Sequence, residues 1–171
     1  MKKKDLIVLG AALGLALALF ALVRSGLLER TPGPQLNSQQ AQGSSVTLSA
    51  LSGGSERQLS LLQPGDKREE AEAYLLINVN NQRYAPLPLD EELRVTIRQP
   101  DGKENVALIA RQGVHMQSAT CPGQECIHQG RVTLDNRDLR ALYNQIICLP
   151  NTVMLDVLDA REAALLYGET P

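Results

Sequence analysis

The sequence has no tryptophan and one phenylalanine, and aromatic residues make up only 3% of its 171 residues. Stacking platforms for bases or sugar rings are therefore scarce, and a core must be built from Leu, Val, Ile and Ala. An excess of positive charge is also lacking, since the net charge is −2. A chain without a basic field has no general means of binding a polyanion, which disfavours nucleic acid as a partner.

The motifs of common enzyme sites are missing as well. The sequence has no glycine-rich phosphate loop, no nucleophile elbow and no histidine beside a plausible serine. The acidic run Asp90-Glu91-Glu92 is explained by a solvated turn before a strand. We therefore predict no catalytic residue, no cofactor and no enzymatic activity.

What the sequence does have is one long apolar run at its start. Residues 6–23 carry no charge and follow three lysines at positions 2–4. At 1.5 Å per residue this run spans about 27 Å, close to the thickness of a hydrocarbon core. It predicts an uncleaved transmembrane helix, with a removed signal peptide as the alternative. Because lysines stay on the cytoplasmic side, residues 1–5 are predicted to be a cytoplasmic tail and the rest extracytoplasmic.

Inside that run, Gly10 and Gly14 form a G-x-x-x-G pattern that permits close packing on another membrane helix. Residues 24–70 then become rich in Ser, Gln, Gly and Pro. Such a segment buries too little apolar surface to offset the entropy of ordering, which predicts a flexible extracytoplasmic linker. Two short β-like runs, residues 46–48 and 59–62, interrupt it.

From residue 71 to residue 160, short β-like runs alternate with turn residues. Residues 73–79 lead into Asn80-Asn81, a pair that tolerates the positive φ of a tight hairpin turn. Residues 93–98 alternate between apolar and polar side chains, as in a half-buried strand. Six or seven such runs predict an all-β fold, a small sandwich or barrel. Residues 161–171 are predicted to form a C-terminal tail.

The most informative side chains are three cysteines, Cys121, Cys126 and Cys148. Thiols outside the cytoplasm meet an oxidising environment, and an odd number leaves at least one unpaired. A Pro-Gly turn is able to bring Cys121 and Cys126 within disulfide distance, and Cys148 is also able to pair with either, so the pairing stays open. The favoured interpretation is a fold-stabilising disulfide and one buried thiol.

The alternative interpretation is a redox or metal site, with His128 as a weak candidate for a fourth ligand. Three thiolates and an imidazole suit zinc or another soft metal. The C-x4-C and C-x-H spacings are not those of a common zinc module, however. We therefore predict no metal site.

The pattern C-P-x-x-x-C-I-x-x-G, from Cys121 to Gly130, is followed after a gap by I-I-C-L-P-N, which ends at Asn151. In this pattern the chain resembles the family of domains similar to NusG domain II, with all three cysteines at the family's positions. The linker and the 131–145 connection are longer than is typical. The resemblance implies an all-β fold, an extracytoplasmic position at a bacterial membrane and an association with flavin-linked redox systems, but no known activity.

These observations together predict a single-pass cell-membrane protein that serves as an accessory or interaction domain, stabilised by a disulfide, beside a membrane-protein complex. The alternative function is redox or metal-binding chemistry in extracytoplasmic, flavin-linked electron transfer. Nucleic-acid binding would rest on fold analogy alone, which does not carry function.

Overall fold

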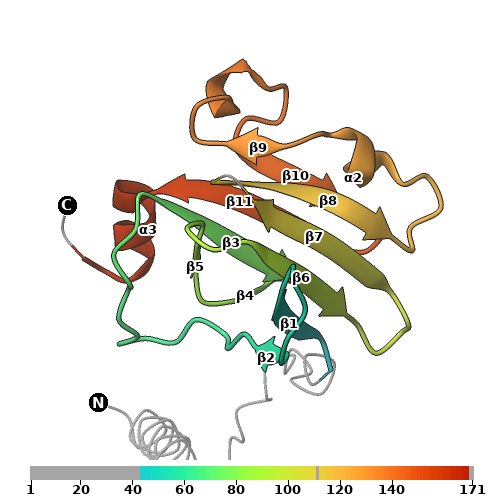
Figure 1. The fold of residues 1–171 in the computed structure, drawn as a ribbon, viewed down its shortest axis with the longest axis horizontal. Coiled ribbons are helices and arrows are strands. Elements are labelled where there is room, and N and C mark those ends of the chain that lie inside the picture. Colours follow the sequence, from blue (N-terminus) through green and yellow to red (C-terminus); the bar gives the residue numbers. More distant parts are fainter. Residues whose placement is uncertain (1–42, 111, 170–171) are drawn as a thin grey trace, which may run out of the picture. The chain divides into compact units, whose positions relative to one another are not determined.

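A computed structural model describes residues 43–110 and 112–169 (Figure 1). The predicted transmembrane helix, with Gly10 and Gly14, and the cytoplasmic tail lie outside the described residues. Within the described ranges, no helix is both long enough and apolar enough to cross a membrane.

The first sheet is antiparallel and has six strands in the order β2-β1-β6-β7-β8-β9. Its centre consists of β6, β7 and β8, with β1 on one side. Neighbouring strands pair in register except for an irregularity between Val106 and Ala107, where β7 meets β8. The bounds are β1 Ser45–Ala50, β2 Arg57–Gln58, β6 Leu93–Arg98, β7 Glu104–Ala110, β8 Gly113–Ala119 and β9 Val132–Thr133.

The second sheet is also antiparallel and follows the order β10-β11-β3-β4, with the short strand β5 paired to β3. The predicted hairpin after residue 79 is confirmed, because Asn80 and Asn81 adopt φ values of 50° and 65° between β3 and β4. The bounds are β3 Ala73–Val79, β4 Gln82–Arg83, β5 Leu87–Pro88, β10 Gln145–Cys148 and β11 Val153–Asp159.

One apolar core lies between the two sheets. Alternate residues of the strands point into it, for example Leu75 and Ile77 from β3 and Val95 and Ile97 from β6. The period of two follows from strand geometry, in which successive side chains point to opposite faces. The core uses Leu, Val, Ile and Ala, as the shortage of aromatic residues requires. The predicted all-β fold is confirmed.

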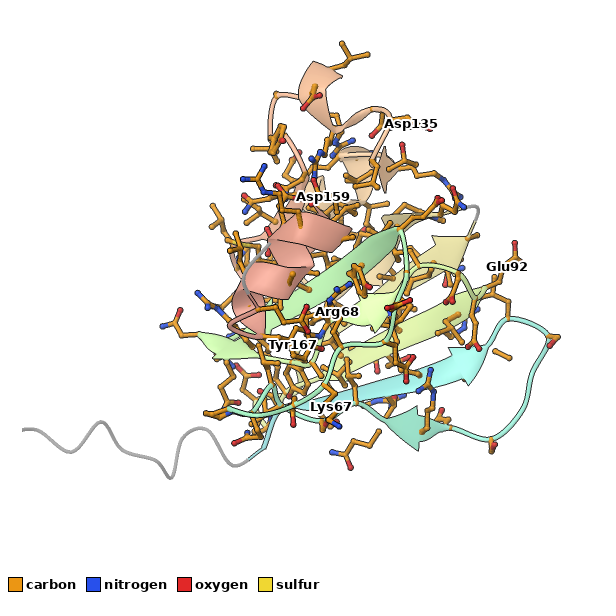
Figure 2. The ribbon with its side chains drawn as sticks, turned by 90° about the vertical axis from the view of Figure 1, so that its left-hand side faces the viewer. Lys67, Arg68, Glu92, Asp135, Asp159 and Tyr167 are labelled. Carbon is orange, nitrogen blue, oxygen red and sulfur yellow. The ribbon has the colours of Figure 1, made fainter. Side chains whose placement is uncertain are left out.

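A short helix follows the last strand. Helix α3 (Ala160–Leu166) begins with a capping box, in which the Asp159 side chain accepts a hydrogen bond from the Glu162 amide and the Glu162 carboxylate accepts one from the Asp159 amide. The helix covers the outer face of the second sheet (Figure 2), where Ala163 packs with Tyr74. Residues 161–166 of the predicted C-terminal tail are therefore helical, because the sheet has a second apolar face to cover.

The domain also begins earlier than residue 71. Val46 and Leu48 of β1 are 0% and 1% exposed, and β1 pairs with β6 along its whole length. Residues 45–70 are thus part of the domain, which corrects this part of the flexible linker predicted over residues 24–70. The linker's first part, residues 24–42, lies outside the described residues. The composition of this segment is polar because β1 has only two core-facing apolar side chains and the following loop lies on the surface.

Candidate functional site

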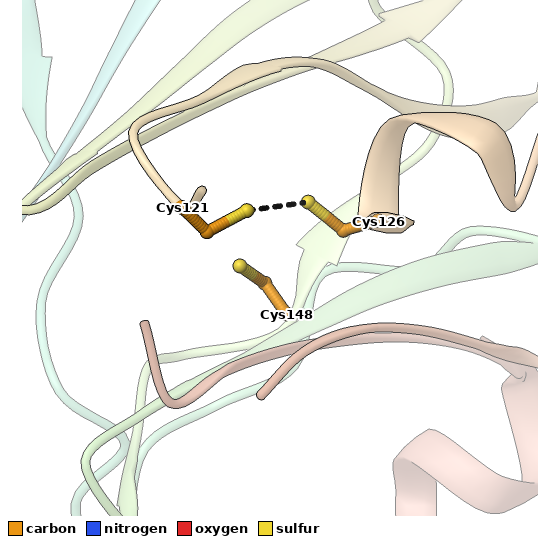
Figure 3. A group of neighbouring side chains, drawn as sticks. All are labelled: Cys121, Cys126 and Cys148. Carbon is orange, nitrogen blue, oxygen red and sulfur yellow. Dashed lines mark hydrogen bonds between the residues drawn. The ribbon is translucent and has the colours of Figure 1, made fainter. Parts of the chain in front are cut away.

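Three separate elements bring the cysteines together at one end of the first sheet. Cys121 lies two residues after the end of β8, Cys126 lies in the single-turn helix α2 (Glu125–His128), and Cys148 is the last residue of β10. Figure 3 shows their side chains converging on one another. The left-handed conformation of Gln124, with φ of 52°, turns the chain between Cys121 and the helix.

The three Sγ atoms all lie within 4.8 Å of one another, and those of Cys121 and Cys126 are 3.8 Å apart. A disulfide bond is about 2.05 Å long. The three cysteines are therefore free thiols in this structure, and the predicted disulfide is not formed in it. Each thiol is buried, with exposed fractions of 4% for Cys121 and 1% for Cys126 and Cys148.

Burial also sets the chemistry of the central thiol. Desolvation, followed by the neighbouring thiol of Cys148, raises the pKa of Cys126 to about 12. Both causes disfavour the thiolate, the first by removing water and the second by hydrogen bonding to the neutral form. At neutral pH the Cys126 side chain is a neutral thiol.

Gln129 fixes the distance between α2 and β10. Its side-chain amide donates to the Ile147 carbonyl and accepts from the Ile147 amide, both at 2.8 Å. Because β10 is an edge strand, this amide pairs with backbone groups that no further strand covers. Gln129 thereby holds Cys126 against Cys148.

Two further polar residues hold the segments on either side of the cysteines. Arg140 donates to the carbonyls of Gln129, Arg131 and Gln145, which closes the long connection after α2. Asn151, after the Leu149-Pro150 pair, is 2% exposed and donates to Asn105 at 2.7 Å. The loop that carries Cys148 is thus tied to the first sheet.

The thiols open on a pocket of about 400 Å³, referred to below as the cysteine pocket. Its walls are mainly apolar side chains, and Leu149 at its rim is 81% exposed. The full lining is Cys121, Gly123, Gln124, Glu125, Cys126, Gln129, Leu142, Ile147, Cys148, Leu149 and Pro150. Three soft donors at the base of an apolar recess are able to hold a soft metal ion or to exchange disulfides.

His128 does not join the cysteines, although it is two residues from Cys126. In the described part of the chain, no histidine or carboxylate has its ligand atom within the 4.8 Å group of thiols. The sequence analysis missed the positioning residues Gln129, Arg140 and Asn151 and the pocket residues Leu142 and Leu149. The only signal for them was their closeness to cysteines in the sequence.

The described residues thus form an all-β domain of two antiparallel sheets with a buried cluster of three thiols. The profile of the family described as NusG domain II matches residues 45–160. The chain belongs to the NusG domain II family, and the resemblance seen in the cysteine motifs is confirmed. No curated protein matches the chain.

Similar solved structures come from three bacteria, and each covers about half of this chain. A DUF1312 family protein from Ruminococcus gnavus is 30% identical, with 50% of this chain and 96% of that chain covered and a TM-score of 0.39. A DUF1312 family protein from Enterococcus faecalis is 15% identical, covering 52% and 98%, with a TM-score of 0.44. The Lin0431 protein from Listeria innocua is 17% identical, with the same coverages and the same TM-score.

Proposed function

We propose that this protein is a membrane-anchored, extracytoplasmic, non-enzymatic accessory domain whose binding site is the cysteine pocket. The observation that carries the proposal is the cluster of three buried thiols beneath an apolar recess with an exposed leucine at its rim. A recess of this kind suits binding, because ligand sites are typically apolar recesses in which a few polar groups converge. The anchor and its orientation are supported by the apolar run at residues 6–23 and the lysines before it.

Topology is tested with two single-cysteine additions to the full chain in intact cells. Ser52→Cys places a thiol on an exposed loop, and Lys3→Cys places one in the predicted cytoplasmic tail. A membrane-impermeant maleimide should label S52C and leave K3C unlabelled, while the buried native cysteines give little background. Labelling of K3C, or protection of S52C, would contradict the orientation.

Recruitment of a partner is tested at the rim of the pocket. A photo-crosslinking residue at position 149 should give one defined adduct with a membrane protein in isolated membranes. The same residue at the exposed position Ser52, which lies beyond the opposite end of the first sheet from Cys121, is the matched control. Equal adducts at both positions, or none at position 149, would count against a partner at the pocket.

Redox chemistry is the second candidate, favoured by the 3.8 Å separation of the Cys121 and Cys126 sulfurs. In this reaction the two thiols lose two electrons and two protons and form an S–S bond, while a disulfide on a partner is reduced to two thiols. This would also supply the stabilising disulfide expected from the sequence, and electron carriers of flavin-linked systems would be its distant acceptors. Mass spectrometry of the full chain, alkylated in denaturant without prior reduction, tests this candidate, since alkylation of all three cysteines would exclude a resting disulfide.

A further inference from the structure

The three thiols have the spacing of ligands around a single metal ion. Metal–sulfur bonds to a small d10 ion are about 2.3 Å long, so three sulfurs in a plane around the ion lie about 4.0 Å apart. The Cys121 and Cys126 sulfurs are 3.8 Å apart, and the Cys148 sulfur is within 4.8 Å of both. A shift of less than an ångström per side chain is enough to place the ion.

The donor set is soft and has only three members. Thiolates select Cu(I), zinc and iron–sulfur clusters over magnesium, calcium and manganese. Structural zinc sites have four protein ligands, and a fourth ligand is missing from this group across the described residues. Cu(I) forms three-coordinate complexes with thiolates, so the three cysteines are able to bind it without a fourth ligand.

The surroundings disfavour a metal ion that needs a water molecule as an additional ligand. Leu142, Leu149 and Pro150 line the mouth above the thiols, so a water ligand to a metal would face apolar side chains. The polar anchors of Gln129 and Asn151 hold two of the cysteine-bearing segments in place before any ion arrives. Such preorganisation lowers the cost of assembling a site.

We infer that Cys121, Cys126 and Cys148 form a three-coordinate site for a soft monovalent metal ion, Cu(I). The inference rests on the proposed function, since it takes the cysteine pocket to be the binding site. On binding, sulfur–hydrogen bonds are replaced by sulfur–copper bonds and the protons pass to solvent, while copper and sulfur keep their oxidation states. Oxidation of two of the thiols to a disulfide removes the site.

The test is an anaerobic titration of the full chain in detergent, reduced beforehand, with Cu(I) supplied from a chromophoric chelator. One ion per chain is expected, and X-ray absorption should show three sulfur neighbours at about 2.3 Å. Cys126→Ser and Cys148→Ser should each weaken binding by more than about 100-fold, since loss of a mere outer partner of a metal ligand already costs 10–100-fold.

A matched control distinguishes the loss of a metal ligand from a general change near the pocket. His128→Ala alters a titratable side chain of α2 that lies outside the group of three thiols and should leave the affinity unchanged. Circular dichroism of the metal-free serine variants establishes whether they fold. If neither Cys126→Ser nor Cys148→Ser folds, Cys121→Ser is used in their place. A stoichiometry other than one, unchanged affinity in the folded serine variants, or tighter four-coordinate binding of Zn²⁺ would overturn the inference. The topology and crosslinking results are independent of copper, so the proposed function can stand when this inference falls.

Discussion

At the scale of single residues, the environment of a side chain decides its chemistry more than its type does. Cys126 is a thiol like any other in composition, but its 1% exposed fraction and its contact with Cys148 place it among the least acidic thiols. Asp156 is a carboxyl that burial drives in the same direction, towards its neutral form. Both cases lead to measurable consequences.

The first prediction concerns alkylation of Cys126. Burial and the neighbouring thiols raise its pKa to about 12, so at neutral pH a far smaller fraction of Cys126 is thiolate than of an ordinary thiol. Iodoacetamide should therefore modify Cys126 in the native, metal-free chain much more slowly than in the urea-unfolded chain. Site-resolved mass spectrometry over time measures both rates, and comparable rates in the two states would show that the pocket is open to solvent.

The second prediction concerns Asp156, which is 6% exposed and accepts hydrogen bonds from Asn78 and Gln145. Burial raises the pKa of Asp156, so the folded state binds a proton more tightly than the unfolded state. Its contribution to stability is therefore complete below the unfolded pKa of about 3.9 and is lost as the pH rises through the folded pKa.

The variant Asp156→Asn cannot ionise, so it does not lose this contribution to stability as the pH rises. Its free energy of unfolding, compared with that of the original chain, should increase as the pH rises above about 4, as measured by urea unfolding. Asp101→Asn is the control of opposite sign, because Lys103 lowers the pKa of Asp101. A difference between D156N and the original chain that stays constant with pH would refute the assignment.

At the scale of elements, the site depends on short segments that have no stability of their own. Helix α2 has four residues and no side-chain cap, and β10 is an edge strand. A single turn of helix is far below the length that is stable in isolation. The two hydrogen bonds of Gln129 to Ile147 join these weak elements to each other.

The third prediction is that Gln129→Ala destabilises the domain by about 1–3 kcal/mol, because the Ile147 amide and carbonyl lose their partners. Because α2 is then free to move, Cys126 should also become more accessible to alkylation. Gln117→Ala is the matched control, because the Gln117 side chain accepts a solvent-exposed hydrogen bond from the side chain of Arg94 and not from a cysteine-bearing segment. Urea unfolding and alkylation rates measure the two effects, and Q129A behaving like Q117A would remove Gln129 as a positioning residue.

At the scale of the whole molecule, the folded domain is larger than residues 71–160, where the sequence pattern predicted strands. Strand β1 supplies Val46 and Leu48 to the common core and pairs with β6, and α3 covers the outer face of the second sheet. Removing either element exposes apolar surface that the remaining strands cannot cover.

The fourth prediction compares two fragments, residues 43–169 and residues 71–169. The longer one should unfold cooperatively, whereas the shorter one should lack a cooperative transition, because it loses β1 and leaves the β6 edge open. Within the longer fragment, Leu48→Ala should cost about 2–5 kcal/mol and the exposed Leu51→Ala within about 0.5 kcal/mol. A cooperative, equally stable fragment 71–169 would restore the boundary predicted from the sequence.

Several features of this chain were determined by local sequence and therefore could be predicted from it. Alternation in residues 93–98 and the Asn80-Asn81 turn depend on neighbours a few positions apart, as do strand period and turn geometry. The cysteine motif from Cys121 to Gly130 identified the family by itself, and the family profile agrees.

The tertiary structure alone decided where the domain begins and ends and what surrounds the thiols. Val46 and Leu48 become core residues only because β6 lies beside them, and Ala163 only because Tyr74 and Leu76 form an outer apolar face. Likewise, Gln129 contacts Ile147, and Asn151 contacts Asn105, across many residues of sequence. Contacts of this kind depend on how the two sheets pack, and no local sequence pattern encodes them. For this reason the pocket lined by the three cysteines could not be predicted from the sequence.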